Sequence, residues 1–237
     1  MDINTDLVKS KKYITPIKSS IQNSSQEYRI LATLRYLYPG RFDNMIKSES
    51  PDLQDSGNSA GIEVTVAVRQ DDMKASRAFS ELCQGEPEKK EKYKEIIKNC
   101  GYSCDLLKGE KLAISSSGTS NEEKIYFQDS IRKKAKKCPQ YRMNFSTVGL
   151  AILLPEIPTS YAETHLSEWI SEATHGTGNL FDFIYVISHR FCIYYDVQTN
   201  GIEKHTLTQE ESNRLSTIGR MTAEGELSLM DKEWCKR

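Results

Sequence analysis

The stretch VGLAILLPE at 148–156 is the most hydrophobic strand-like segment of the chain. A strand with apolar residues at nearly every position belongs in the interior of a sheet, where both of its faces are covered. Amphipathic helical patterns follow Ser24-Ser25 up to Pro39-Gly40 and again over 161–174. Strand and helix patterns alternate along the chain, which predicts an α/β fold with a mixed β-sheet flanked by helices.

The remaining patterns fit one large domain in a chain of 237 residues. The segment 62–68 alternates β-branched residues with others after a Gly/Ser/Asn loop, which predicts a β-hairpin whose second arm is a central strand. Two inserted helices are expected at about 70–99, and a long helix at 121–138 that Pro139 ends. The expected organisation is a flexible N-terminal arm at 1–22, a single domain at 23–207, and a C-terminal helix with a polar tail at 208–237.

The overall charge is nearly balanced, with 32 Lys and Arg against 33 Asp and Glu. This argues against a protein covered in positive charge, although a local basic patch remains open. No apolar run approaches the roughly 18 residues that a membrane-spanning helix needs, and the first residues lack the apolar core of a secretory signal. Six cysteines in a chain of this length fit reduced thiols, so a cytoplasmic location and no membrane partner are expected.

Two acidic residues stand out in and before the predicted hairpin. Asp52 follows Pro51, and Glu63 lies within the apolar strand sequence IEVTVAV, where strand propensity does not favour it. Glu63 and Thr65 point to the same face of that strand, and the hairpin can bring Asp52 beside them. Two adjacent carboxylates repel each other unless a cation lies between them, and Mg²⁺ binds oxygen ligands of this kind. A solvent-facing Glu and an Asp in a turn are the alternative interpretation.

These residues resemble the PD-(D/E)xK nuclease superfamily, in which such a hairpin carries the metal site. The resemblance covers roughly residues 24–155 and implies a restriction-endonuclease-like fold with Mg²⁺ or Mn²⁺ held by Asp52 and Glu63. Thr65 stands where the family pattern has lysine, and members of the superfamily supply that lysine from a neighbouring helix or do without it. Lys134, which borders the apolar stripe of the 121–138 helix, is the expected replacement, and Lys137 is the second choice.

Glu27 is a third candidate metal ligand, because a helix acid in this place can join the metal shell in the family. Its alternative role is a favourable interaction with the dipole at the start of the first helix. The long helix and the residues after it also carry a basic run without any acid, which predicts contacts to phosphates: Arg132, Lys133, Lys136, Lys137 and Arg142. A solvated helix face explains the same run.

The sequence thus leaves two hypotheses of different kinds. The first is a divalent-metal-dependent nuclease that hydrolyses phosphodiester bonds, with DNA favoured over RNA as the partner and with Asp52, Glu63, Thr65 and Lys134 in the catalytic site. The second is a catalytically inactive module of the same fold that binds nucleic acid or protein, which Thr65 favours. Whether a homodimer assembles to cut two strands stays open.

Overall fold

The computed structural model describes residues 2–4, 16–55, 57, 59–84, 87–107, 111–116, 123–154, 160–178, 180–231 and 234–236. Its centre is a seven-stranded sheet in the order β10-β9-β8-β7-β4-β3-β2. The middle strands β4, β7 and β8 run parallel, while the outer pairs are antiparallel, so the predicted mixed sheet is confirmed. These strands span Met45–Lys47 (β2), Leu53–Asp55 (β3), Ala60–Val66 (β4), Thr147–Leu153 (β7), Phe183–Ile187 (β8), Phe191–Asp196 (β9) and Ile202–Thr206 (β10).

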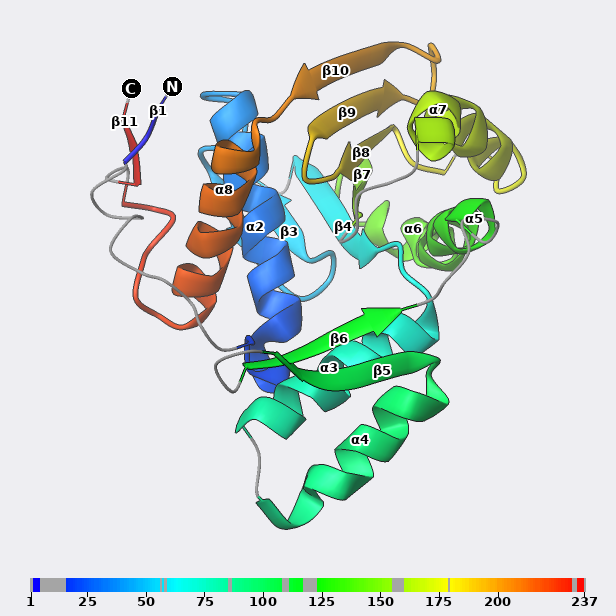
Figure 1. Cartoon of the computed structure of the whole chain (residues 1–237). Coiled ribbons are helices and arrows are strands. Elements are labelled where there is room, and N and C mark those ends of the chain that lie inside the picture. Colours follow the sequence, from blue (N-terminus) through cyan, green and yellow to red (C-terminus); the bar gives the residue numbers. More distant parts are fainter. Residues whose placement is uncertain are drawn as a thin grey trace.

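Helices cover both faces of this sheet, as Figure 1 shows. The helices α2 (Gln22–Leu37) and α8 (Gln209–Ala223) lie on one face, and α5 (Glu123–Ala135), α6 (Cys138–Tyr141) and α7 (Ser160–His175) lie on the other. The side chains of β4 alternate, so the strand contacts the helices on both faces of the sheet. Ile62 and Val64 are buried in the core cluster that includes α2, whereas Glu63 is turned toward α5. The predicted hairpin with a central second strand is confirmed, with Leu53 paired to Ile62.

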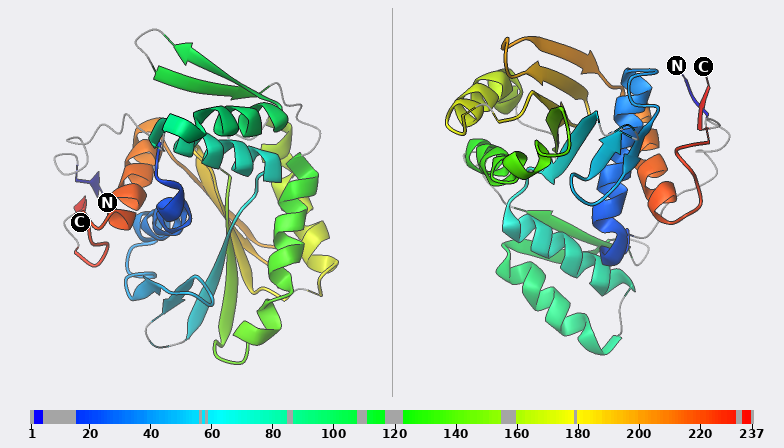
Figure 2. Two further views of the ribbon diagram at one scale, coloured as in Figure 1. Left: turned by 90° about the horizontal axis from the view of Figure 1, so that it is seen from below. Right: turned by 180° about the vertical axis from the view of Figure 1, so that it is seen from behind.

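The segment between β4 and α5 forms an insertion at one end of the molecule (Figures 1 and 2). It contains the two helices α3 (Gln70–Gln84) and α4 (Lys90–Asn99), as the sequence predicts, and a separate hairpin of β5 (Tyr102–Leu107) and β6 (Lys111–Ser116). A short 3-10 turn, Pro87–Lys89, joins the helices. A small apolar cluster around Leu82 and Ile97 holds α3 and α4 together.

Two predicted helix boundaries are wrong. The first helix begins at Gln22, after a 3-10 turn over Ser19–Ile21, and its first turn contains no acidic residue. The dipole explanation for Glu27 therefore fails. The long helix ends at Ala135, and Pro139 lies in the first turn of α6, where its missing N–H costs no helix hydrogen bond.

The C-terminal helix α8 packs directly on α2. A Cβ atom on Gly219 would lie 2.6 Å from the Ser25 carbonyl oxygen and 2.7 Å from the Arg29 nitrogen, so only glycine permits this approach. The expected arm at 1–22 falls mostly outside the described residues, but Asp2–Ile3 (β1) pairs with Cys235–Lys236 (β11). None of the described helices is long and apolar enough to cross a membrane.

Candidate active site

Glu63 is the most deeply buried acid among the described residues. Its side chain is 1% exposed, although carboxylates rarely lie in a core without a partner. The alternation of β4 turns it away from the α2 layer and toward α5 and α6. Partners there hold both of its oxygens, so the alternative of a solvent-facing Glu63 is wrong.

Two lysines and a tyrosine hold this carboxylate. Lys134 Nζ lies 2.6 Å from Glu63 Oε1, and Lys137 Nζ lies 3.3 Å from the same oxygen. Tyr141 donates its hydroxyl to Glu63 Oε2 at 2.7 Å. The break between α5 and α6 matters here, because it directs a residue from the last turn of α5, one from the link and one from α6 toward the same carboxylate.

Asp52 lies beside this group at the start of the hairpin. Its Oδ2 accepts a hydrogen bond from the Val64 backbone nitrogen at 2.7 Å and lies 4.0 Å from Lys134 Nζ. The hairpin closes tightly at this point, since a Cβ atom on Gly61 would lie 2.5 Å from Pro51 Cγ. One ammonium group therefore contacts both predicted metal-binding carboxylates.

The two carboxylates differ in their protonation equilibria. Burial raises the pKa of Asp52, and the negative charge of Glu63 raises it further, against the opposing hydrogen bond from Val64. Burial acts in the same direction on Glu63, but the hydrogen bonds from Lys134 and Tyr141 outweigh it, so the pKa of Glu63 lies below its ordinary value. Burial and the bond to Glu63 both raise the pKa of Tyr141. The surroundings thus favour the charged form of Glu63 and disfavour that of Asp52, relative to a free side chain.

Glu27 reaches the edge of the same cluster through Lys47, a residue of β2 that the sequence patterns did not single out. Lys47 Nζ lies 3.0 Å from Glu27 Oε2, and these side chains are 25% and 16% exposed. Burial lowers the pKa of Lys47, but Glu27 raises it more, and the net direction is upward. The structure pairs Glu27 with a lysine and does not place it against Glu63.

Thr65 lies two residues beyond Glu63 on the same face of β4 and lines an open groove together with Lys134. A threonine hydroxyl cannot supply a positive charge. In this structure, Lys134 brings an ammonium group to the carboxylates from the neighbouring helix.

The five residues of the predicted phosphate-binding run have different surroundings. Arg142 forms an ion pair with Asp182 at 2.8 Å and also donates to the Leu180 carbonyl oxygen. Arg132 contacts Gln128 and Asp129 on its own helix. Lys137 belongs to the carboxylate cluster but remains 57% exposed. The exposed side chains of the run also include Lys133 and Lys136. The two arginines are thus held by contacts within the protein.

The donor set of the cluster fits a hard divalent cation. Mg²⁺ in proteins is typically held by one or two carboxylates and several waters, so Asp52 and Glu63 are sufficient. The Asp52 side chain is 20% exposed, which leaves a route from solvent, and Lys134 shows that a positive charge is already accommodated between the two acids. Within the described parts of the chain, no group of three or more His, Cys, Asp and Glu side chains converges as a metal site. Among the described residues, Asp52 and Glu63 would hold the ion together with water.

Comparison with known proteins adds no relative to this description. No family model, no curated protein and no solved structure matches the chain. The sheet, its helical layers and the cluster around Glu63 are the observations from which function has to be inferred.

Proposed function

We propose that this protein is a divalent-metal-dependent nuclease of the restriction-endonuclease-like fold, which acts on DNA in the cytoplasm. The observation that carries the proposal is the position of the Lys134 ammonium group, 2.6 Å from Glu63 and 4.0 Å from Asp52. Two carboxylates and a lysine, gathered beside the interior strand β4 of the mixed sheet, are the kind of groups that metal-assisted phosphodiester hydrolysis uses.

Each residue has a distinct role in this proposal. Asp52 and Glu63 would hold Mg²⁺ or Mn²⁺, which when bound lowers the pKa of a coordinated water and neutralises charge on the scissile phosphate. Lys134 supplies positive charge on the substrate side, in place of the lysine that Thr65 replaces. Tyr141 and Lys137 fix the orientation of Glu63, so that its carboxylate would face the metal in one position.

Cleavage of linear DNA in the presence of Mg²⁺ tests this function directly. Asp52→Asn preserves the shape of the side chain and removes its charge, so it should abolish cleavage. Asp71→Asn is the matched control, because Asp71 is 57% exposed on α3 and pairs with Lys74 away from the cluster. Equal cleavage by both variants would contradict the proposal.

The alternative is an inactive module of the same fold, and one observation favours it. Glu63 already has two lysines and a tyrosine as partners, so its charge is compensated without any further cation. Calorimetric titration with Mn²⁺ separates the two functions. Binding that is lost in Asp52→Ala supports the nuclease, whereas nucleic-acid binding by a protein indifferent to Mn²⁺ supports the module.

A further inference from the structure

A groove of about 540 Å³ opens beside the carboxylate cluster. It is bounded by the end of β4, the start of α3 and one face of α5. Lys134 belongs to both the groove and the cluster, and Thr65 lines the groove two residues beyond Glu63. Its volume lies within the usual range for sites that hold small molecules. A ligand in this groove would therefore lie next to the proposed reaction centre.

The lining combines positive charge with apolar surface. Lys133, Lys134 and Arg69 bring positive charge to the lining, of which Lys134 pairs with Glu63 and Arg69 with Asp72. Val68, Met73 and Tyr126 supply apolar surface. The acid in the lining, Asp129, lies 3.5 Å from Arg132 Nη1 on the same helix, and this contact offsets its charge. Such a lining is complementary to a molecule that is anionic at one end and apolar at the other.

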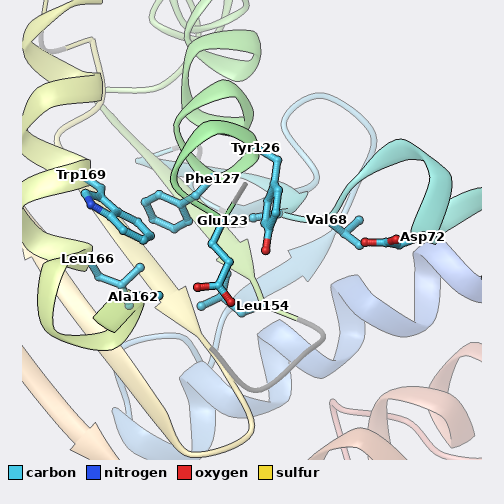
Figure 3. A pocket seen from close by; sticks show the side chains of 10 residues that line it. Val68, Asp72, Glu123, Tyr126, Phe127, Leu154, Ala162, Leu166 and Trp169 are labelled. Carbon is cyan, nitrogen blue, oxygen red and sulfur yellow. The ribbon is translucent and has the colours of Figure 1, made fainter. Parts of the chain in front are cut away.

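Tyr126 and Val68 also line a second, smaller pocket. In Figure 3 the ring stands between Phe127 and Val68, with Trp169 and Leu166 further along the pocket wall. That pocket holds only about 30 Å³, which is room for one or two waters and not for a ligand. Tyr126 is half-buried, so packing holds its ring in place as a wall of the larger groove.

We propose that this groove holds one nucleotide of an unpaired strand, with its base against Tyr126 and its phosphate against Lys133 and Lys134. The inference rests on the proposed nuclease function and narrows the substrate to single-stranded nucleic acid at the point of cleavage. A duplex presents its phosphates outward and covers the faces of its bases by stacking, so it has nothing to place against Val68, Met73 and Tyr126. An unpaired base exposes a flat face that an aromatic side chain can stack on.

Fluorescence anisotropy with the full chain in EDTA tests this inference without cleavage. The probes are a labelled DNA strand of about 15 nucleotides, in the range of site sizes of single-strand binders, and the duplex of the same sequence. The single strand should bind more tightly. Tyr126→Ala should weaken single-strand binding roughly 5- to 140-fold, the effect of losing one stacked base. Tyr126→Leu keeps apolar bulk in the wall and should show a loss in the same direction if Tyr126→Ala does not fold.

Variants inside and outside the groove distinguish binding in the groove from nonspecific binding elsewhere on the surface. Lys133→Ala should reduce the slope of log affinity against log salt by about 0.7, the value for one phosphate contact on a single strand. Lys98→Ala and Tyr161→Leu are the controls, since Lys98 is exposed on α4 and Tyr161 is 65% exposed on α7, and neither lines the groove. Equal binding of duplex and single strand, or equal losses in Tyr126→Leu and Tyr161→Leu, would overturn the inference.

The outcome is distinguishable from that of the proposed function. If Asp52→Asn abolishes cleavage while Tyr126→Leu binds the single strand like the wild type, the inference is wrong and the nuclease proposal stands. If no divalent metal supports cleavage but Tyr126→Leu loses single-strand binding, the groove assignment stands and the nuclease proposal fails.

Discussion

The hydroxyl of Tyr141 and the ammonium group of Lys134 hold opposite oxygens of Glu63, at 2.7 Å from Oε2 and 2.6 Å from Oε1. The carboxylate is therefore fixed in orientation as well as in charge. Because the Glu63 side chain is 1% exposed, water cannot readily replace either partner.

Tyr141→Phe should lower the stability of the protein. The change removes one hydroxyl and leaves Glu63 Oε2 without that donor, so the free energy of unfolding should fall by about 1–3 kcal/mol. Urea denaturation measures it. Tyr195→Phe is the control, because Tyr195 donates to the neutral Asn200 at 2.6 Å, and its loss should be about 0.5–1.5 kcal/mol. A smaller effect for Tyr141→Phe than for Tyr195→Phe would contradict the role of Tyr141.

Substitutions at the two carboxylates should act in opposite directions. Carboxylate repulsion alone predicts that Glu63→Gln leaves stability unchanged or slightly raised. The contacts with Lys134, Lys137 and Tyr141 reverse this expectation, so Glu63→Gln should lower the free energy of unfolding by about 1–3 kcal/mol at pH 7. Asp52→Asn should raise it by less than about 1 kcal/mol, because the pKa of Asp52 lies above its ordinary value. Two losses of equal size in urea denaturation would refute this assignment.

The pH dependence of stability follows from the same two shifts. The lowered pKa of Glu63 contributes stability that is fully present above the ordinary value of 4.5 and is lost as the pH falls through the folded-state pKa. Glu63→Gln should therefore flatten the loss of stability below about pH 4.5. The raised pKa of Asp52 has the opposite sign, so the penalty for its charge disappears as the pH falls. Asp52→Asn should steepen the acid loss, and denaturation from pH 7 to pH 3 checks both profiles.

Lys134→Met should tighten the binding of divalent cations while it slows any cleavage. The ammonium group lies between the two acids, so its removal relieves repulsion toward an incoming ion and should lower the Kd for Mn²⁺ about tenfold. Calorimetric titration measures this affinity. Lys136→Met, two residues further along the same basic run but exposed, should leave the Kd unchanged. Weaker Mn²⁺ binding by Lys134→Met than by Lys136→Met would show that the lysine does not compete with the ion.

Glu27→Gln should have a structural effect only. Glu27 pairs with Lys47 at 3.0 Å, and a partly exposed pair contributes about 0.2–1 kcal/mol to stability. The Kd for Mn²⁺ should stay within about twofold of the wild-type value. Loss of a metal ligand would change the Kd by about tenfold or more, which corresponds to about 1.4 kcal/mol. A loss comparable to that of Asp52→Asn would restore Glu27 as a metal ligand.

Local patterns predicted the part of the site that depends on periodicity. Alternation along IEVTVAV puts Glu63 and Thr65 on one face of β4, and the position of Lys134 beside the apolar stripe of its helix indicates the lysine that reaches the carboxylates. The sequence does not predict the contact from Tyr141 or the break before α6, because Pro139 by itself indicates only a helix end. Its position in the first turn of α6 depends on how the chain folds back toward the sheet.

Contacts between residues far apart in the chain have no comparable pattern in the sequence. Lys47 lies on a strand of only three residues, too short for any recognisable alternation. Strand β10 is largely exposed and lacks an apolar stripe. The packing of α8 on α2 depends on Gly219, and a single glycine within a helical pattern does not show which neighbour approaches it.

The insertion between β4 and α5 can also be considered as a loop whose two ends are fixed by the sheet. The entropy of closing such a loop grows only with the logarithm of its length, so each doubling costs about 0.6 kcal/mol. Changes in the length of α4, β5 and β6 should therefore cost the sheet little and leave Asp52 and Glu63 in place. The start of α3, which carries Met73 into the groove, belongs to this insertion. The residues proposed to carry out the chemistry thus lie outside the insertion, whose length can vary. A change in the insertion can therefore alter the shape of the groove while Asp52 and Glu63 stay in place.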